Sequence, residues 1–125
     1  MLTSKLPVFS IQKEEVVQIF NQQLENCGVE YFDYFLLHNM NIHHYNSVVK
    51  SCKMFEHMQE WKKAEKIKHI AISFHDSADV LDLILSEHPE IEAVQIALNY
   101  YDWNSAFIQV KACFEVIRKY QKQVI

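Results

Sequence analysis

The chain has 125 residues, of which 50% are hydrophobic and 22% are charged, and its formal net charge is −4. This length suffices for one domain with a modest core, and the composition is close to that of an average soluble globular protein. Disordered, fibrous and membrane classes are therefore disfavoured. The longest basic run, residues 62–68, lies at the expected end of a helix, where cations complement the terminal carbonyls, so no nucleic-acid partner is expected.

The cysteines and the amino-terminal region indicate the compartment. Cys27, Cys52 and Cys113 are odd in number, widely spaced and set in apolar periodic segments. This pattern is typical of reduced thiols rather than of disulfides or a zinc site. No signal peptide precedes Lys5, and no apolar stretch approaches the length of a membrane span. We expect a cytoplasmic protein without membrane contact.

The first half of the chain predicts strand, helix and strand in that order. Residues 2–6 form a short apolar run that predicts a strand. Ser10 can cap the following helix, and Gly28, the only glycine, can end it in a left-handed conformation. Residues 31–37 are nearly all apolar or aromatic, which is typical of a strand buried on both faces of a parallel sheet. Residues 39–46 are predicted to form a polar loop.

The second half repeats this alternation. A wide apolar stripe over residues 48–61 predicts a helix, and residues 69–73 a third strand. Asp76 and its neighbours can cap a third helix that Pro89 stops, and a fourth strand is expected at about residues 93–98. Ser105 then opens a last helix that extends through residue 117. Val124 and Ile125 predict the beginning of another strand.

Four strand-helix units of about 30 residues indicate an α/β fold with a parallel sheet. Two closed architectures fit this order, a doubly wound sheet and a segment of a (β/α)₈ barrel, and periodicity alone does not choose between them. A glycine-rich turn after a strand, needed for close approach to a phosphate, is missing because Gly28 stands alone. The chain therefore carries neither a Rossmann fingerprint nor a P-loop.

Polar or ionisable side chains stand at the carboxyl end of each expected strand. They are Lys5, His38, Ser73 with His75, and residues 95–99 beginning at Gln95. In parallel α/β folds this edge is where ligands bind. Each residue alone has a simpler explanation, as a solvated side chain or a strand-end hydrogen bond, but their recurrence predicts a site.

Other groupings of reactive side chains are weaker. Four histidines were candidates for a metal site: His38, His43, His44 and His75. Their spacing matches no usual ligand pattern, so no metal is expected. Asp33 and Asp76 could pair only if the fold brings them together, and Asp76 can serve as a helix cap. Cys27 lies on a helix face without a partnered base, which disfavours a nucleophilic role.

Four stretches, residues 2–7, 24–38, 66–77 and 94–100, resemble the aldo-keto reductase family in order and spacing. The first resembles the strand that bears the catalytic lysine, and the second resembles the segment that ends in the catalytic histidine. The other two resemble strands that contact the nicotinamide carboxamide. The resemblance implies a partial (β/α)₈ TIM barrel, a single partial domain over residues 1–125 with about four parallel βα units corresponding to strands 3–6.

The resemblance also implies an oxidoreductase that uses NAD(P)H to reduce a small carbonyl compound to an alcohol. Lys5 and His38 match the catalytic positions, and Ser73 and Gln95 match the cofactor-binding positions. The family favours NADPH over NADH. The carbonyl substrate is not identified, because specificity depends on variable loops.

Three departures from the family pattern stand out. Phe74 replaces a usual asparagine and is followed by His75, a variation associated with the branch that carries a carboxyl-terminal iron-sulfur extension. No cysteine cluster of that kind occurs here, so no such cofactor is assigned. Ala64 and Ala71 stand where relatives commonly have glycine, which predicts a weaker turn before the third strand.

The family's tyrosine and its aspartate partner belong to earlier strands, and its phosphate-binding loops lie later than Ile125. We therefore expect an internal fragment, from a truncated gene or an incomplete sequence, that is inactive alone. Open strand edges would favour self-association. The alternative is a non-catalytic α/β interaction or regulatory module derived from the same barrel, in which the strand-end residues are relics.

Overall fold

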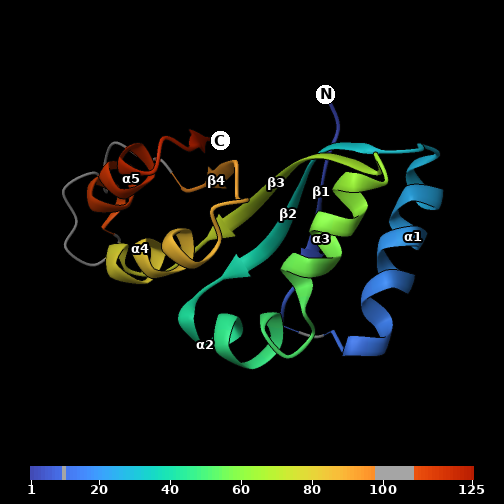
Figure 1. The fold of residues 1–125 in the computed structure, drawn as a ribbon, viewed down its shortest axis with the longest axis horizontal. Coiled ribbons are helices and arrows are strands. Elements are labelled where there is room, and N and C mark those ends of the chain that lie inside the picture. Colours follow the sequence, from blue (N-terminus) through green and yellow to red (C-terminus); the bar gives the residue numbers. More distant parts are fainter. Residues whose placement is uncertain (10, 98–108) are drawn as a thin grey trace.

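The computed structural model describes residues 1–9, 11–97 and 109–125. Within these ranges, strands and helices alternate along one parallel sheet (Figure 1). The strands are β1 (Thr3–Pro7), β2 (Phe32–Met40), β3 (Ile67–Phe74), β4 (Ala93–Gln95) and β5 (Gln123–Val124). They lie in the sheet in sequence order, and every neighbouring pair is parallel, which confirms the predicted α/β class.

The helices fall between the strands. They are η1 (Lys13–Glu15, 3₁₀), α1 (Val16–Cys27), α2 (Ile42–His44), η2 (Tyr45–Val49, π), α3 (Met54–Lys63), α4 (Ala78–Glu87) and α5 (Val110–Lys119). Figure 1 shows α1 and α3 beside each other next to the first strands, whereas α4 and α5 lie together near β4. The predicted caps Ser10 and Ser105 and the strand residue Leu98 lie outside the described residues. None of the helices in the described ranges is long and apolar enough to cross a membrane.

The main core lies between the sheet and the helices. On α1 the buried residues are Val16, Phe20 and Leu24, spaced four apart as the apolar stripe predicts. The Phe20 ring stacks on Trp61 of α3 with centroids 3.8 Å apart and meets Phe35 of β2 edge-on at 5.0 Å. These aromatic contacts fix α1 and α3 against the same face of the sheet.

A smaller cluster occupies the opposite face of the sheet. Leu36, Ala71 and Ala93 are fully buried there, and Tyr34 and Ile125 pack against them. Leu36, Ala71 and Ala93 are partners in the strand register, so they form one row across three strands. Two alanines in this row leave space for longer side chains from neighbouring rows.

The segment after β2 differs from the prediction. In place of a loop over residues 39–46, β2 continues to Met40 and is followed by the helical turns of α2 and η2. Met40 and Tyr45 are fully buried, which anchors this polar stretch to the core. The side chain of Asn41 accepts the backbone N–H of His44 at 2.9 Å and so caps the first turn of α2.

Three connections from a helix to the next strand use the same left-handed turn. The left-handed residues are Gly28 (φ 63°), Glu65 (φ 57°) and Gln121 (φ 55°). Gly28 ends α1 as predicted. Before β3 the turn does form, with the N–H of Lys66 bonded to the carbonyl of Trp61 at 2.8 Å. The left-handed position of this turn is occupied by Glu65 and not by Ala64. The absence of a glycine therefore bears on the backbone conformation of Glu65.

Candidate active site

The strand register places the predicted site residues on one face of the sheet. One row across the sheet consists of Lys5, Leu36, Ala71 and Ala93. Side chains alternate along a strand, so the residues two positions further lie on the same face, nearer the carboxyl edge. That next row consists of two register pairs, Pro7 with His38 and Ser73 with Gln95, and between these pairs the register of β2 and β3 shifts after Leu37. Four separate stretches of sequence thus meet at one edge.

A hydrogen bond joins the first and fourth strands across this face. Lys5 Nζ donates to Gln95 Oε1 at 2.6 Å, although the two residues are 90 positions apart in the sequence. Both side chains are half-buried. Lys5 thus reaches from its own row to a side chain of the next row. Lys5 is therefore not a merely solvated strand-end lysine.

His38 stands between charged and aromatic groups at the end of β2. Burial, followed by the positive charge of Lys5 and the influence of His75, lowers the pKa of His38 below its usual range. The ring of Phe9 meets the imidazole edge-on, with centroids 5.9 Å apart. At neutral pH this imidazole is accordingly uncharged, with one N–H donor and one acceptor nitrogen.

Ser73 is almost completely buried, with 3% of its surface exposed. Its Oγ lies 3.3 Å from Nε2 of His75, which follows the end of β3. Beside it in the register, Gln95 presents an amide group. A hydroxyl and an amide side by side can each donate and accept a hydrogen bond, which complements the C=O and NH₂ of a carboxamide. The residues present therefore fit the carboxamide of a nicotinamide.

The two aspartates considered from sequence do not meet. Asp33 lies at the start of β2, where its carboxylate accepts the N–H of Leu2 at 2.7 Å and pairs with Lys68 at 2.8 Å. Asp76 follows the other end of β3 and accepts the N–H of Ile42 at 2.8 Å. Asp76 thus satisfies the first turn of α2 instead of capping α4. No paired-carboxylate chemistry arises from these two residues.

Of the cysteines, Cys113 lies nearest to this edge of the sheet, with Sγ 3.8 Å from the carbonyl oxygen of Asp76. All three are free thiols, Cys27 exposed and Cys52 and Cys113 buried. Burial, with the nearby charge of Asp76, raises the pKa of Cys113 to about 11, which keeps it protonated. Among the described residues, no group of three or more His, Cys, Asp or Glu side chains could hold a metal ion.

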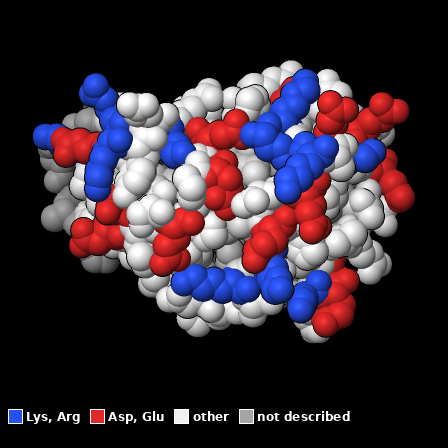
Figure 2. Space-filling model, viewed as in Figure 1, with Lys and Arg blue, Asp and Glu red and all other residues white. Residues whose placement is uncertain are grey.

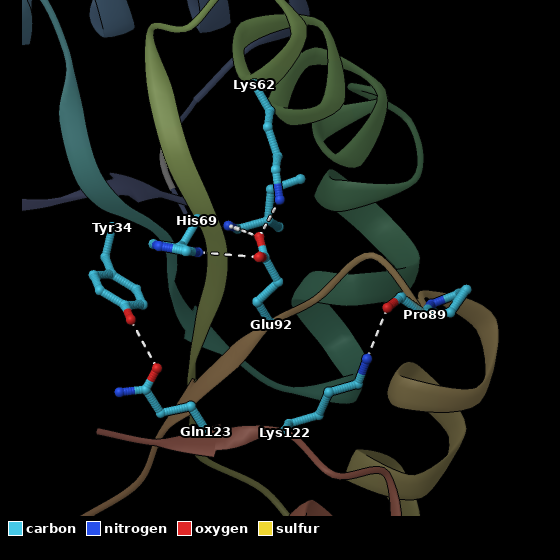
Figure 3. Close-up of polar contacts among 8 residues, drawn as sticks. Tyr34, Lys62, His69, Pro89, Glu92, Lys122 and Gln123 are labelled. Carbon is cyan, nitrogen blue, oxygen red and sulfur yellow. Dashed lines mark hydrogen bonds and ion pairs between the residues drawn. The ribbon is translucent and has the colours of Figure 1, made fainter.

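A second polar cluster, which the sequence did not reveal, lies toward the amino ends of the strands (Figure 3). Glu92, just before β4, pairs with Lys62 of α3 and accepts from His69 Nδ1 at 3.0 Å. The His69 ring stacks on Tyr34 with centroids 4.7 Å apart, and the Tyr34 hydroxyl donates to Gln123 at 2.7 Å. This amino-end cluster connects β2, β3, β5, α3 and the residue before β4, which indicates a structural role.

The lysines of residues 62–68 also form ion pairs. Lys62 pairs with Glu92, and Lys68 pairs with Asp33 and lies over the ring of Tyr31 at 4.2 Å from its centroid. Figure 2 shows cationic and anionic side chains intermingled over the face in view. The run therefore follows the end of α3, as predicted, with acidic side chains beside it.

Lys5 of β1 and His38, Ser73 and Gln95, which stand nearer the carboxyl ends of β2, β3 and β4, share one face of a parallel sheet of βα units, an arrangement typical of (β/α)₈ barrels. The family model described as the aldo/keto reductase family matches residues 1–125. The chain belongs to this family. No curated protein matches the chain. Membership of the iron-sulfur branch stays a prediction.

Solved aldo-keto reductases share the fold. An enzyme from a Medee basin deep-sea metagenome library superposes with a TM-score of 0.72 at 19% identity, over 99% of this chain and 42% of that one. A Brucella melitensis protein gives 0.73 at 20%, over 98% and 44%. A Klebsiella pneumoniae protein in complex with NADP and acetate gives 0.72 at 14%, over 98% and 40%. The chain thus spans about two fifths of the length of these structures, which confirms the predicted partial barrel.

Proposed function

We propose that this chain carries part of the active site of an NAD(P)H-dependent reductase that acts on a small carbonyl compound. The observation that supports this most strongly is the common face shared by four side chains at the carboxyl edge of β1–β4. The bond between Lys5 and Gln95 at 2.6 Å shows that residues from the outermost of these strands reach the same place.

Ser73 and Gln95 are proposed to hold the carboxamide of the nicotinamide, since they present hydroxyl and amide groups side by side. Their contact would orient one face of the ring toward the substrate. The reduced nicotinamide supplies the hydride when it is bound. NADPH is the favoured cofactor, and two Klebsiella pneumoniae relatives were solved with NADP or NADPH.

His38 is proposed to polarise the substrate carbonyl. Its lowered pKa keeps the imidazole neutral at pH 7, so a single ring N–H can donate to the carbonyl oxygen. This hydrogen bond would strengthen as negative charge develops on the oxygen during reduction. The half-buried position of the ring favours this effect, because a lower local dielectric strengthens electrostatic interactions.

Lys5 is proposed to act through its charge. The family resemblance assigns it the role of lowering the pKa of a proton-donating tyrosine, and an ammonium group within a few ångströms has that effect. The same charge already contributes to the lowered pKa of His38. Lys5 Nζ lies 2.6 Å from Oε1 of Gln95, the residue proposed to bind the nicotinamide, and this contact supports the proposed role.

The binding claim can be tested by titrating the chain with reduced nicotinamide mononucleotide and with NADPH, followed by dihydronicotinamide fluorescence. Ser73→Ala and Gln95→Ala should each weaken binding by roughly 5- to 10-fold, the equivalent of one lost hydrogen bond. Ser86→Ala is the matched control, because the Ser86 hydroxyl bonds to Leu83 O within α4. Equal affinity in all four proteins, or no binding to any of them, would refute the proposal.

A further inference from the structure

His75 lies at the mouth of the candidate active site. Strand alternation places residues 71 and 73 on the same face, and His75 follows the end of β3. Exposure rises from Ala71 (0%) through Ser73 (3%) to an exposed His75. The backbone N–H of His75 bonds to the carbonyl of Met40 at 2.9 Å, which fixes the start of the turn to β2. The imidazole then folds back so that Nε2 lies 3.3 Å from Ser73 Oγ.

Whether Nε2 carries a proton, as it does in the imidazolium and in one neutral tautomer, determines what the Ser73 hydroxyl can offer a ligand. If Nε2 is unprotonated, it accepts the Ser73 proton, and the serine oxygen is left as an acceptor. If Nε2 carries a proton, it donates to the serine oxygen, and the hydroxyl proton becomes available to a ligand. A carboxamide turns its NH₂ toward Ser73 when the serine oxygen is an acceptor, and its C=O when the hydroxyl proton is available.

Protonation also adds charge to a face that is already positive. His75 and Lys5 both act on the pKa of His38 at the end of β2, and Asp76 follows His75 in the sequence. The α2 turn, which bonds to Asp76, adds His43 and His44 to the titratable groups of this region. The Asp76 carboxylate is engaged by the N–H groups of Ile42 and Ser77, at 2.8 and 2.7 Å. In the described strands, no carboxylate lies in the two rows that contain Lys5 and His38.

We infer that His75 is a positioning residue that acts through Ser73, and that its protonated form makes the site favour reduced over oxidised nicotinamide. The reason is electrostatic: the oxidised ring is a cation and the reduced ring is neutral, so a nearby imidazolium repels only the oxidised form. An imidazole is the ordinary side chain that gains charge between pH 8 and pH 6. This inference rests on the proposed function, because it requires the ring to bind beside Ser73.

The effect is measured as a ratio of two affinities. Dissociation constants of reduced and oxidised nicotinamide mononucleotide are determined at pH 8 and pH 6 on the full chain. Titration of the ligand phosphate is common to both forms and cancels in the ratio. For two unit charges in a partly solvated site, the preference for the reduced form should rise by roughly three- to fivefold at pH 6.

Two variants separate a positioning role from a structural one. His75→Gln keeps a hydrogen-bonding side chain without a titrating charge, so its preference should not change with pH. His57→Gln is the matched control, because His57 lies on α3, where it contacts Glu60 and Trp61 and no residue of the candidate active site. It should behave like the unsubstituted chain.

The outcomes distinguish the two claims. If neither form of the ligand binds at any pH, the proposed function and this inference both fail. If both forms bind, but the ratio is independent of pH in the unsubstituted chain, only the assignment of His75 fails. The assignment also fails if His75→Gln retains the pH dependence.

Discussion

Replacing Glu92 with glutamine keeps the shape of the side chain but removes its charge from the amino-end cluster. The carboxylate pairs with Lys62 and accepts from His69 at 3.0 Å and from the N–H of Ile70 at 3.1 Å. Burial raises the pKa of Glu92, but the bonds to these three groups outweigh it, so the pKa is lowered overall. Folding is therefore more favourable with the ionised carboxylate than with the protonated one.

The expected loss is about 1–2 kcal/mol in the free energy of unfolding. The ion pair with Lys62 contributes under about 1 kcal/mol, because the Lys62 side chain is 40% and the Glu92 side chain 36% exposed. Each hydrogen bond that the neutral amide weakens costs roughly a further 0.5–1 kcal/mol. Urea denaturation at pH 7, followed by the fluorescence of the tryptophans, measures this difference. Glu115→Gln, on the exposed side of α5, is the control.

The pH dependence gives a sharper criterion. A carboxyl group with a lowered pKa contributes stability above its unfolded pKa of about 4.3, and this contribution is lost as the pH falls through the lower folded value. The difference between the unsubstituted chain and Glu92→Gln should therefore shrink below about pH 4. Equal stability at pH 7, or a difference that persists unchanged in acid, would refute this account of the cluster.

Three further substitutions and one chemical reaction test the fold. In urea titrations, Gly28→Ala should destabilise the chain by about 1 kcal/mol and Glu65→Gly should stabilise it by about 0.5 kcal/mol, because both positions have positive φ. A Cβ at position 28 would touch nothing within 4 Å, so the cost there is that of the backbone conformation alone. A thiol reagent at pH 8 should modify Cys27 rapidly and Cys113 only on unfolding, since Cys113 is buried with its pKa raised to about 11; equal rates would contradict the burial. Tyr45→Phe should cost about 1.5–2 kcal/mol by thermal or urea unfolding, because the buried hydroxyl bonds to two side chains at the end of α4, and an unchanged midpoint would show that those bonds contribute little.

The order and approximate positions of the strands were predictable, because the alternation of apolar runs with helical stripes and the composition of those runs both indicate them. Apolar runs between helical stripes locate β1 to β4, and parallel strands bring their carboxyl ends to one edge. The grouping of Lys5, His38, Ser73 and Gln95 could therefore be expected before the sheet register was known. The contact between Lys5 and Gln95 was not predictable, because the two residues are 90 positions apart and only the strand register brings them together.

The segment after β2 and the second polar cluster were missed for a different reason. Residues 39–46 are polar in composition, and only tertiary burial of Met40 and Tyr45 turns this stretch into strand and helix. Tyr45 reaches Glu87 and lies 2.9 Å from His88 Nε2, partners some 40 residues away. Glu92 likewise bonds to residues 22 and 30 positions earlier. Such long-range polar contacts leave no periodic signal in the sequence.

The central claim is that the carboxyl edge of β1–β4 binds a nicotinamide ring, and a chemical-shift map of the backbone amides tests it most directly. Reduced nicotinamide mononucleotide is added to the isotope-labelled chain. The largest shifts should occur at His38, Ser73 and Gln95, with little change at Tyr34 and His69 near the amino ends of the strands. Shifts concentrated at the amino ends, or none at millimolar ligand, would contradict the assignment of this edge as the active site.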